Sequence, residues 1–162
     1  MLKAFIASPT TRYLIWFRLG SYMHGKKRRM FFYPIVYFFH RHLQYKTGIQ
    51  IRLQTKIGGG LRFVHFGDVV LNASASLGKN CVVFNGVTLG SVRLGGLAPT
   101  VGNNVVICTG AKLIGDITVG SNVVIGAGAV VVKDVPDNAV VAGVPAKILS
   151  MDGEEKVKAW KR

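Results

Sequence analysis

Large aliphatic residues recur every six positions along the C-terminal two thirds of the chain. The series runs from Leu71 to Val131 and is interrupted only at Gly95. A small or β-branched residue usually follows each aliphatic four places later. The aliphatic positions are 71, 77, 83, 89, 101, 107, 113, 119, 125 and 131. A period of six predicts short strands separated by bends and stacked into a β-solenoid, whereas a plain antiparallel sheet would not keep ten aliphatics on one grid.

The repeat loses step around a single histidine. Ile51, Ile57 and Phe63 show the same spacing, but they are two residues out of phase with the later series. The stretch between the two sets, "GLRFVHFGDVVLN" at 60–72, contains His65. This histidine is either packed in the core or carried by a distorted coil that exposes its imidazole.

Residues 1–47 follow a different pattern from residues 48–149. Their apolar runs, 13–17 and 30–39, are too short to span a bilayer. They predict two helices joined around the basic run 26–29, with apolar faces that dock on the next domain, another subunit or lipid. The last segment, 150–162, is expected to form a tail or a short amphipathic helix.

The charge of the chain is concentrated at its N-terminal end. The formal net charge is +14, and the 67 residues before Asp68 contain twelve Lys or Arg and no acidic residue. This asymmetry indicates an anionic partner. "FFYPIVYFF" is too apolar for a surface that is wetted when nucleic acid is absent, so we expect no nucleic acid and favour a peripheral contact of residues 1–47 with an anionic membrane. Cys81 and Cys108 lie in valine-rich segments and are expected to be small core residues.

Several stretches resemble the hexapeptide-repeat acyltransferases. "ICTGAKLIGDITVGSNVVIGAGAVVVKDVPDNAVVAGVPAKIL" is similar to their C-terminal signature, and "TKIGGGLRFVHFGDVVLN" with "VVFNGVTLG" resembles the serine acetyltransferase-like branch. The aromatic and basic N-terminal segment is closer to bacterial enzymes that O-acetylate capsule, O-antigen or exopolysaccharide. The resemblance implies an all-β, left-handed parallel β-helix, a homotrimer, and acetyl-CoA as co-substrate with no bound cofactor.

Acetyl transfer to a hydroxyl needs a base, and the resemblance assigns this role to His65. Asp68, three residues later, is a candidate for orienting the imidazole. Three positions depart from the serine acetyltransferase pattern, where Gln50, Val64 and Ala98 replace polar residues. These departures favour a sugar hydroxyl in polysaccharide biosynthesis as the acceptor. The alternative is serine O-acetylation for cysteine biosynthesis.

The resemblance also implies binding residues. Asn85 and Arg93 are the acceptor candidates, and the loop 91–100 is expected to cover the site. The acetyl-CoA candidates are Gly90, Thr109, Gly110, Ala127, Gly128, Lys133 and Lys147.

Two other classes of protein are alternatives to an acetyltransferase. A zinc-dependent solenoid enzyme needs several histidines, and His65 is the only one after position 42, so no metal site is expected. A non-enzymatic solenoid that binds an anionic membrane or nucleic acid stays an alternative. An enzyme of this kind is expected in the cytoplasm, at the inner face of the membrane if the helical segment binds lipid.

Overall fold

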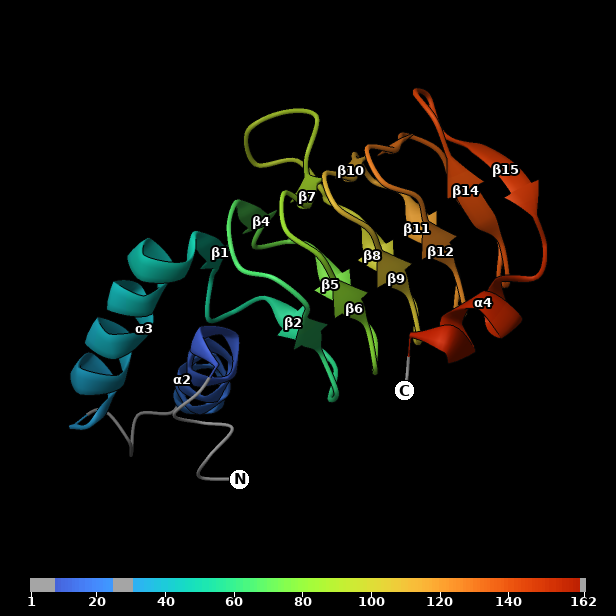
Figure 1. Cartoon of the computed structure of the whole chain (residues 1–162). Helices are drawn as coiled ribbons and strands as arrows, with labels where there is room; N and C mark the ends of the chain where they lie inside the picture. The colour runs from blue at the N-terminus through green and yellow to red at the C-terminus, as the bar shows by residue number, and fades with distance from the viewer. Residues whose placement is uncertain (1–7, 25–30, 161–162) are drawn as a thin grey trace.

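The computed structural model describes residues 8–24 and 31–160, and it places a pair of helices at one end of a β-solenoid (Figure 1). Helix α2 (Pro9–Met23) begins after Ser8, whose hydroxyl accepts a hydrogen bond from the amide of Thr11. Helix α3 (Tyr33–Thr47) ends at Gly48, which adopts the left-handed conformation with φ 67°. The two helices confirm the prediction for this segment. The basic run 26–29 lies outside the described residues.

The solenoid consists of three sheets in which every strand pair is parallel except β14 with β15. The first sheet contains β1 (Ile49–Ile51), β4 (Val69–Leu71), β7 (Thr88–Gly90), β10 (Lys112–Ile114) and β13 (Val130–Val131). The second sheet contains β2 (Lys56–Ile57), β5 (Ser76–Leu77), β8 (Thr100–Val101) and β11 (Thr118–Val119). The third sheet contains β3 (Arg62–Phe63), β6 (Val82–Val83), β9 (Val106–Ile107), β12 (Val124–Ile125), β14 (Val140–Ala142) and β15 (Lys147–Ser150). This arrangement confirms the predicted parallel β-solenoid.

The six-residue aliphatics form the core of the solenoid. In the first sheet, Ile51 pairs with Leu71, Leu71 with Leu89, Leu89 with Leu113 and Leu113 with Val131. All five side chains are at most 3% exposed. Each coil therefore buries its aliphatics against those of the coils above and below, which is why the period persists in the sequence.

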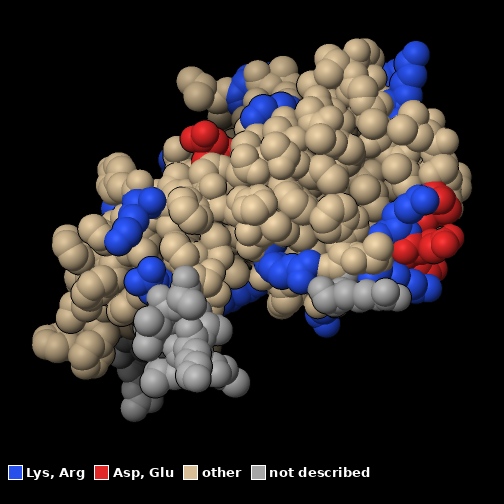
Figure 2. Space-filling model, viewed as in Figure 1, with Lys and Arg blue, Asp and Glu red and all other residues tan. Residues whose placement is uncertain are grey.

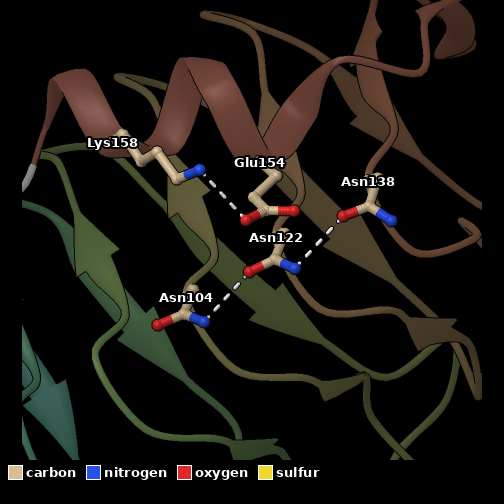
Figure 3. A network of polar contacts seen from close by, with 5 residues as sticks. All are labelled: Asn104, Asn122, Asn138, Glu154 and Lys158. Carbon is tan, nitrogen blue, oxygen red and sulfur yellow. Dashed lines mark hydrogen bonds and ion pairs between the residues drawn. The ribbon is translucent and has the colours of Figure 1, made fainter.

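An asparagine ladder marks the corner between the second and third sheets. Asn104, Asn122 and Asn138 have φ values of 57 to 60°, a conformation that asparagine tolerates better than most residues. The Asn104 amide donates to Asn122 at 2.9 Å, and the Asn122 amide donates to Asn138 at 3.1 Å. Helix α4 (Gly153–Ala159) passes over this ladder and carries an ion pair between Lys158 and Glu154 (Figure 3).

The helix pair packs on the first coil of the solenoid. Tyr13 and Phe17 are fully buried, and the ring of Tyr13 meets that of Phe63 edge to face with centroids 6.3 Å apart. The Arg18 guanidinium donates to the carbonyls of Ile57 and Gly58. On the face shown in Figure 2, the helical part carries Lys and Arg but no Asp or Glu. Within residues 8–24 and 31–160, no helix has the length and apolar character needed to cross a bilayer.

Candidate active site

His65 lies at a corner that is two residues longer than the repeat requires. The inward-facing Phe63 and Leu71 are eight positions apart, whereas a regular coil separates such residues by six. The extra length is taken up in residues 64–68, which we call the His65 corner; Gly67 and Asp68 there have φ values of 115° and 51°. The His65 side chain is exposed. The phase slip therefore lifts the imidazole out of the solenoid, and His65 is not a core residue.

The ring of His65 contacts the ring of Phe84, the residue that follows β6. The two centroids are 6.2 Å apart and the ring planes make an angle of 61°. Asp68 is exposed, and in the described part of the chain no hydrogen bond joins its carboxylate to His65. Its predicted orienting role stays a proposal.

A column of tight turns continues from the His65 corner along the solenoid. It consists of Gly67, Asn85–Gly86, Thr109–Gly110 and Ala127–Gly128, and we call it the corner column. Each glycine amide donates to the preceding coil: Gly86 to Gly67, Gly110 to Asn85 and Gly128 to Thr109. The Thr109 hydroxyl also donates to the Asn85 side-chain oxygen at 3.1 Å.

The turns of the corner column present backbone donors. Gly110 and Gly128 have φ values of 73° and 66°, and a hydrogen bond closes each turn, from Ala111 to Cys108 and from Ala129 to Gly126. Among the described residues, the amides of Thr109 and Ala127 find no acceptor, as expected for the second residue of such a turn. Two stacked N–H groups are therefore available to a ligand that carries amide carbonyls.

The structure separates the remaining predicted residues from the His65 corner. Gly90 lies at the far end of β7, and Arg93 is exposed in the loop that follows it. Lys133 is exposed beyond the end of β13. Lys147 begins β15 and pairs with Ala142, so it lies near the C-terminal end of the corner column. Only Asn85, Thr109, Gly110, Ala127 and Gly128 are brought together along that column.

A basic groove lies between α3 and the loop 91–97, and sequence reasoning did not identify it. Its volume is about 790 Å³, and its lining includes Arg41, Gln44, Gln50 and Arg52. Gly48 also lines the groove, and a Cβ added there would lie 3.0 Å from the Asp68 amide nitrogen, so the groove adjoins the His65 corner. The available signal was the alternation along β1, which turns the odd-numbered aliphatics inward and the polar residues at 50 and 52 outward.

The thiols and the metal-binding side chains contribute little to this site. Burial raises the pKa of both Cys81 and Cys108, so the two thiols are protonated at neutral pH and are poor nucleophiles. In the part of the chain that the structure describes, no three His, Cys, Asp or Glu side chains gather as a metal site. The arrangement favours base-assisted transfer directly between two bound substrates.

Comparison with known proteins identifies relatives along nearly the whole chain. Residues 98–133 match the family Bacterial transferase hexapeptide (six repeats). Serine acetyltransferase from Staphylococcus xylosus is 34% identical over 157 residues, which cover 96% of this chain and 71% of that protein. Serine acetyltransferase from Neisseria gonorrhoeae has a similar structure, with a TM-score of 0.77, 30% identity, and coverage of 91% of this chain and 56% of that one.

A third neighbour was solved with a bound ligand. Serine acetyltransferase from Brucella abortus in complex with coenzyme A has a TM-score of 0.72 and 32% identity, over 85% of this chain and 54% of that one. This chain thus spans little more than half the length of the two structural neighbours. The relatives confirm the predicted enzyme class, an O-acetyltransferase, and acetyl-CoA fits as its co-substrate.

The prediction that the acceptor is a polysaccharide sugar is wrong. All three relatives are named serine acetyltransferase, which favours the alternative prediction. The sequence argument rested on the polar groups lost at Gln50, Val64 and Ala98, and it overlooked the positive charge that Arg41 and Arg52 add to the groove. Taken together, the solenoid, its repeats and these relatives show that the chain belongs to the bacterial hexapeptide transferase family, among the relatives of the serine acetyltransferases.

Proposed function

We propose that this chain is an acetyl-CoA-dependent O-acetyltransferase of the serine acetyltransferase type, with His65 as the general base. The observation that carries the proposal is the two-residue extension of the His65 corner, which exposes the imidazole at the start of the corner column. An imidazole side chain is suited to accepting the hydroxyl proton of serine as a general base.

The reaction proceeds in one bound complex. The serine hydroxyl gives its proton to the His65 imidazole while its oxygen bonds to the carbonyl carbon of the acetyl thioester. The resulting tetrahedral oxyanion then collapses, the carbon–sulfur bond breaks, and the departing thiolate of coenzyme A takes the proton from the imidazolium. O-acetylserine and free coenzyme A are the products, and no covalent acetyl-enzyme is needed.

The two substrates are assigned to different surfaces. The free amides of Thr109 and Ala127 are suited to the amide carbonyls of the pantetheine arm, and Lys147 is suited to a phosphate at the C-terminal end of the column. The basic groove suits the carboxylate of the acceptor, because Arg41 and Arg52 supply positive charge there. Asn85 stays a candidate acceptor contact, while Arg93 belongs to the loop beside the groove.

Thiol release from acetyl-CoA tests the proposal. We expect release in the presence of serine, and a loss of about two to four decades in His65→Ala. His42→Ala is the matched control, because His42 is also exposed but lies on α3. Absence of turnover with serine would refute the acceptor, and equal turnover in wild type and His65→Ala would refute the assigned base.

We also propose that the helix pair binds an anionic membrane peripherally. Phe31, Phe32, Ile35 and Phe38 are each more than half exposed, so the pair presents an apolar face to solvent. Since the first 67 residues carry no acidic side chain, two copies meeting through this face would bring like charges together. An anionic bilayer instead attracts them, at about 1 kcal/mol for each Lys or Arg near its surface.

Co-sedimentation with phosphatidylserine vesicles at low salt tests the membrane contact. We expect binding that high salt weakens and that Phe32→Ser combined with Phe38→Ser abolishes. Leu94→Ser is the control, because Leu94 is a fully exposed apolar residue on the solenoid. Equal sedimentation with neutral vesicles, or no loss in the double variant, would contradict the proposal.

The predicted homotrimer is the state typical of the family, and we propose it for this chain. Light scattering coupled to gel filtration should give three times the mass of one chain. A monomer at micromolar concentration would refute it.

A further inference from the structure

Helix α4 is fixed across the outer face of the third sheet. Val82, Val106 and Val124 point outward from three neighbouring strands, yet all are buried because Val157 of α4 covers them. The amide of Gly153 donates to the carbonyl of Asn138 at 2.8 Å, which attaches the start of the helix to the asparagine ladder. The helix therefore has one defined direction on the sheet, and this direction leads its last residue toward the His65 corner.

Trp160, which directly follows α4, connects this helix to His65 through Phe84. The rings of Trp160 and Phe84 meet edge to face, with centroids 5.3 Å apart and planes at 84°. Phe84 in turn makes the contact with His65 at 6.2 Å and 61°. The Arg62 guanidinium donates to the Trp160 carbonyl, so both the ring and the backbone of Trp160 are held.

We propose that Phe84, supported by Trp160, is a positioning residue that sets the orientation of the His65 imidazole. This inference rests on the proposed role of His65 as the base. The side chain of Val64, the residue before His65, has no group that could accept a hydrogen bond from the ring. Phe84 instead supplies an aromatic surface that favours one ring orientation. The C-terminal helix thereby becomes part of the active site.

Substitutions at Phe84 separate orientation from packing. Phe84→Leu keeps an apolar side chain against α4 but removes the ring, whereas Phe84→Tyr retains the ring. We expect Phe84→Leu to lower kcat about two- to tenfold with little change in the KM for acetyl-CoA, and Phe84→Tyr to restore kcat. Trp160→Leu and Trp160→Phe should behave as a second pair. Tyr22→Leu is the control, because Tyr22 is an exposed aromatic on α2.

Nuclear magnetic resonance detects the orientation of the His65 ring independently of enzyme activity. The ring protons of His65 are identified by their loss in His65→Gln, and their chemical shifts report the nearby Phe84 ring. We expect these resonances to move in Phe84→Leu, to stay close to wild type in Phe84→Tyr, and to stay unchanged in Tyr22→Leu.

Each outcome decides one of the two proposals. His65 resonances that do not move in Phe84→Leu, or an unchanged kcat, would overturn the positioning role. Resonances that move in a protein with no serine turnover in its wild-type form would support the ring contact and overturn the proposed function. If circular dichroism shows that Phe84→Leu is unfolded, the Trp160→Leu and Trp160→Phe pair gives the same comparison.

Discussion

Acidification should weaken the attachment of the helix pair, because His40 of α3 is buried as a neutral imidazole. His40 is 2% exposed and lies against Tyr13 and Phe17, with ring centroids 5.3 and 6.0 Å away. Burial, with a smaller contribution from the neighbouring Arg41 guanidinium, lowers the pKa of His40 from 6.5 to about 4. Protonation therefore disfavours the folded state.

The size of the effect follows from the two pKa values. Between pH 6.5 and about 4, the unfolded chain binds a proton at this position and the folded chain does not, so stability falls as the pH falls. At 1.36 kcal/mol per pKa unit, the full difference corresponds to about 3 kcal/mol at pH 4 and below. Above pH 6.5 the contribution of His40 no longer changes with pH.

Urea denaturation at a series of pH values measures this contribution. Protonation of carboxylates also changes stability below about pH 5, so the relevant quantity is the difference between wild type and His40→Leu. This difference should shift by about 3 kcal/mol in favour of His40→Leu between pH 7 and pH 4. His42→Leu is the control, since His42 is exposed on the same helix. Parallel profiles for wild type and His40→Leu would refute the reasoning.

Three further predictions concern the solenoid and its corner column. Leu113→Ala removes a fully buried core side chain and should lower the unfolding free energy by about 2–5 kcal/mol, measured by urea denaturation; a cost below about 1 kcal/mol would contradict the stacked core. In Gly78→Ala the new Cβ would lie 2.5 Å from the backbone oxygen of the next coil, so Tm should fall, whereas Gly59→Ala has open space and should leave Tm nearly unchanged; equal Tm values would argue against close coil contact. Ala127→Pro removes one free amide at a turn position that favours proline, so the KM for acetyl-CoA should rise about two- to tenfold with stability preserved; an unchanged KM would exclude this amide from coenzyme A binding.

The sequence by itself determined the solenoid and the position of its irregularity. The sequence has a six-residue period because each aliphatic packs on its equivalents in neighbouring coils, so the pattern directly reflects the core. The phase slip between Phe63 and Leu71 is equally local: two extra residues have to leave the stack, and His65 is among the residues that do. The turns at Thr109–Gly110 and Ala127–Gly128 were also readable, because glycine takes the positive φ that each turn requires.

Only the tertiary structure decided what surrounds His65. The groove combines Arg41 of a helix, Arg52 after a strand and a loop some forty residues further on, and no periodicity in the sequence records that proximity. Likewise, Phe84 and Trp160 are far apart along the chain and meet only because Val157 seats α4 on the third sheet. Core positions repeat because each coil packs against a neighbouring coil of the same shape. A functional site instead combines single residues from unrelated elements, and their proximity depends on how those elements pack.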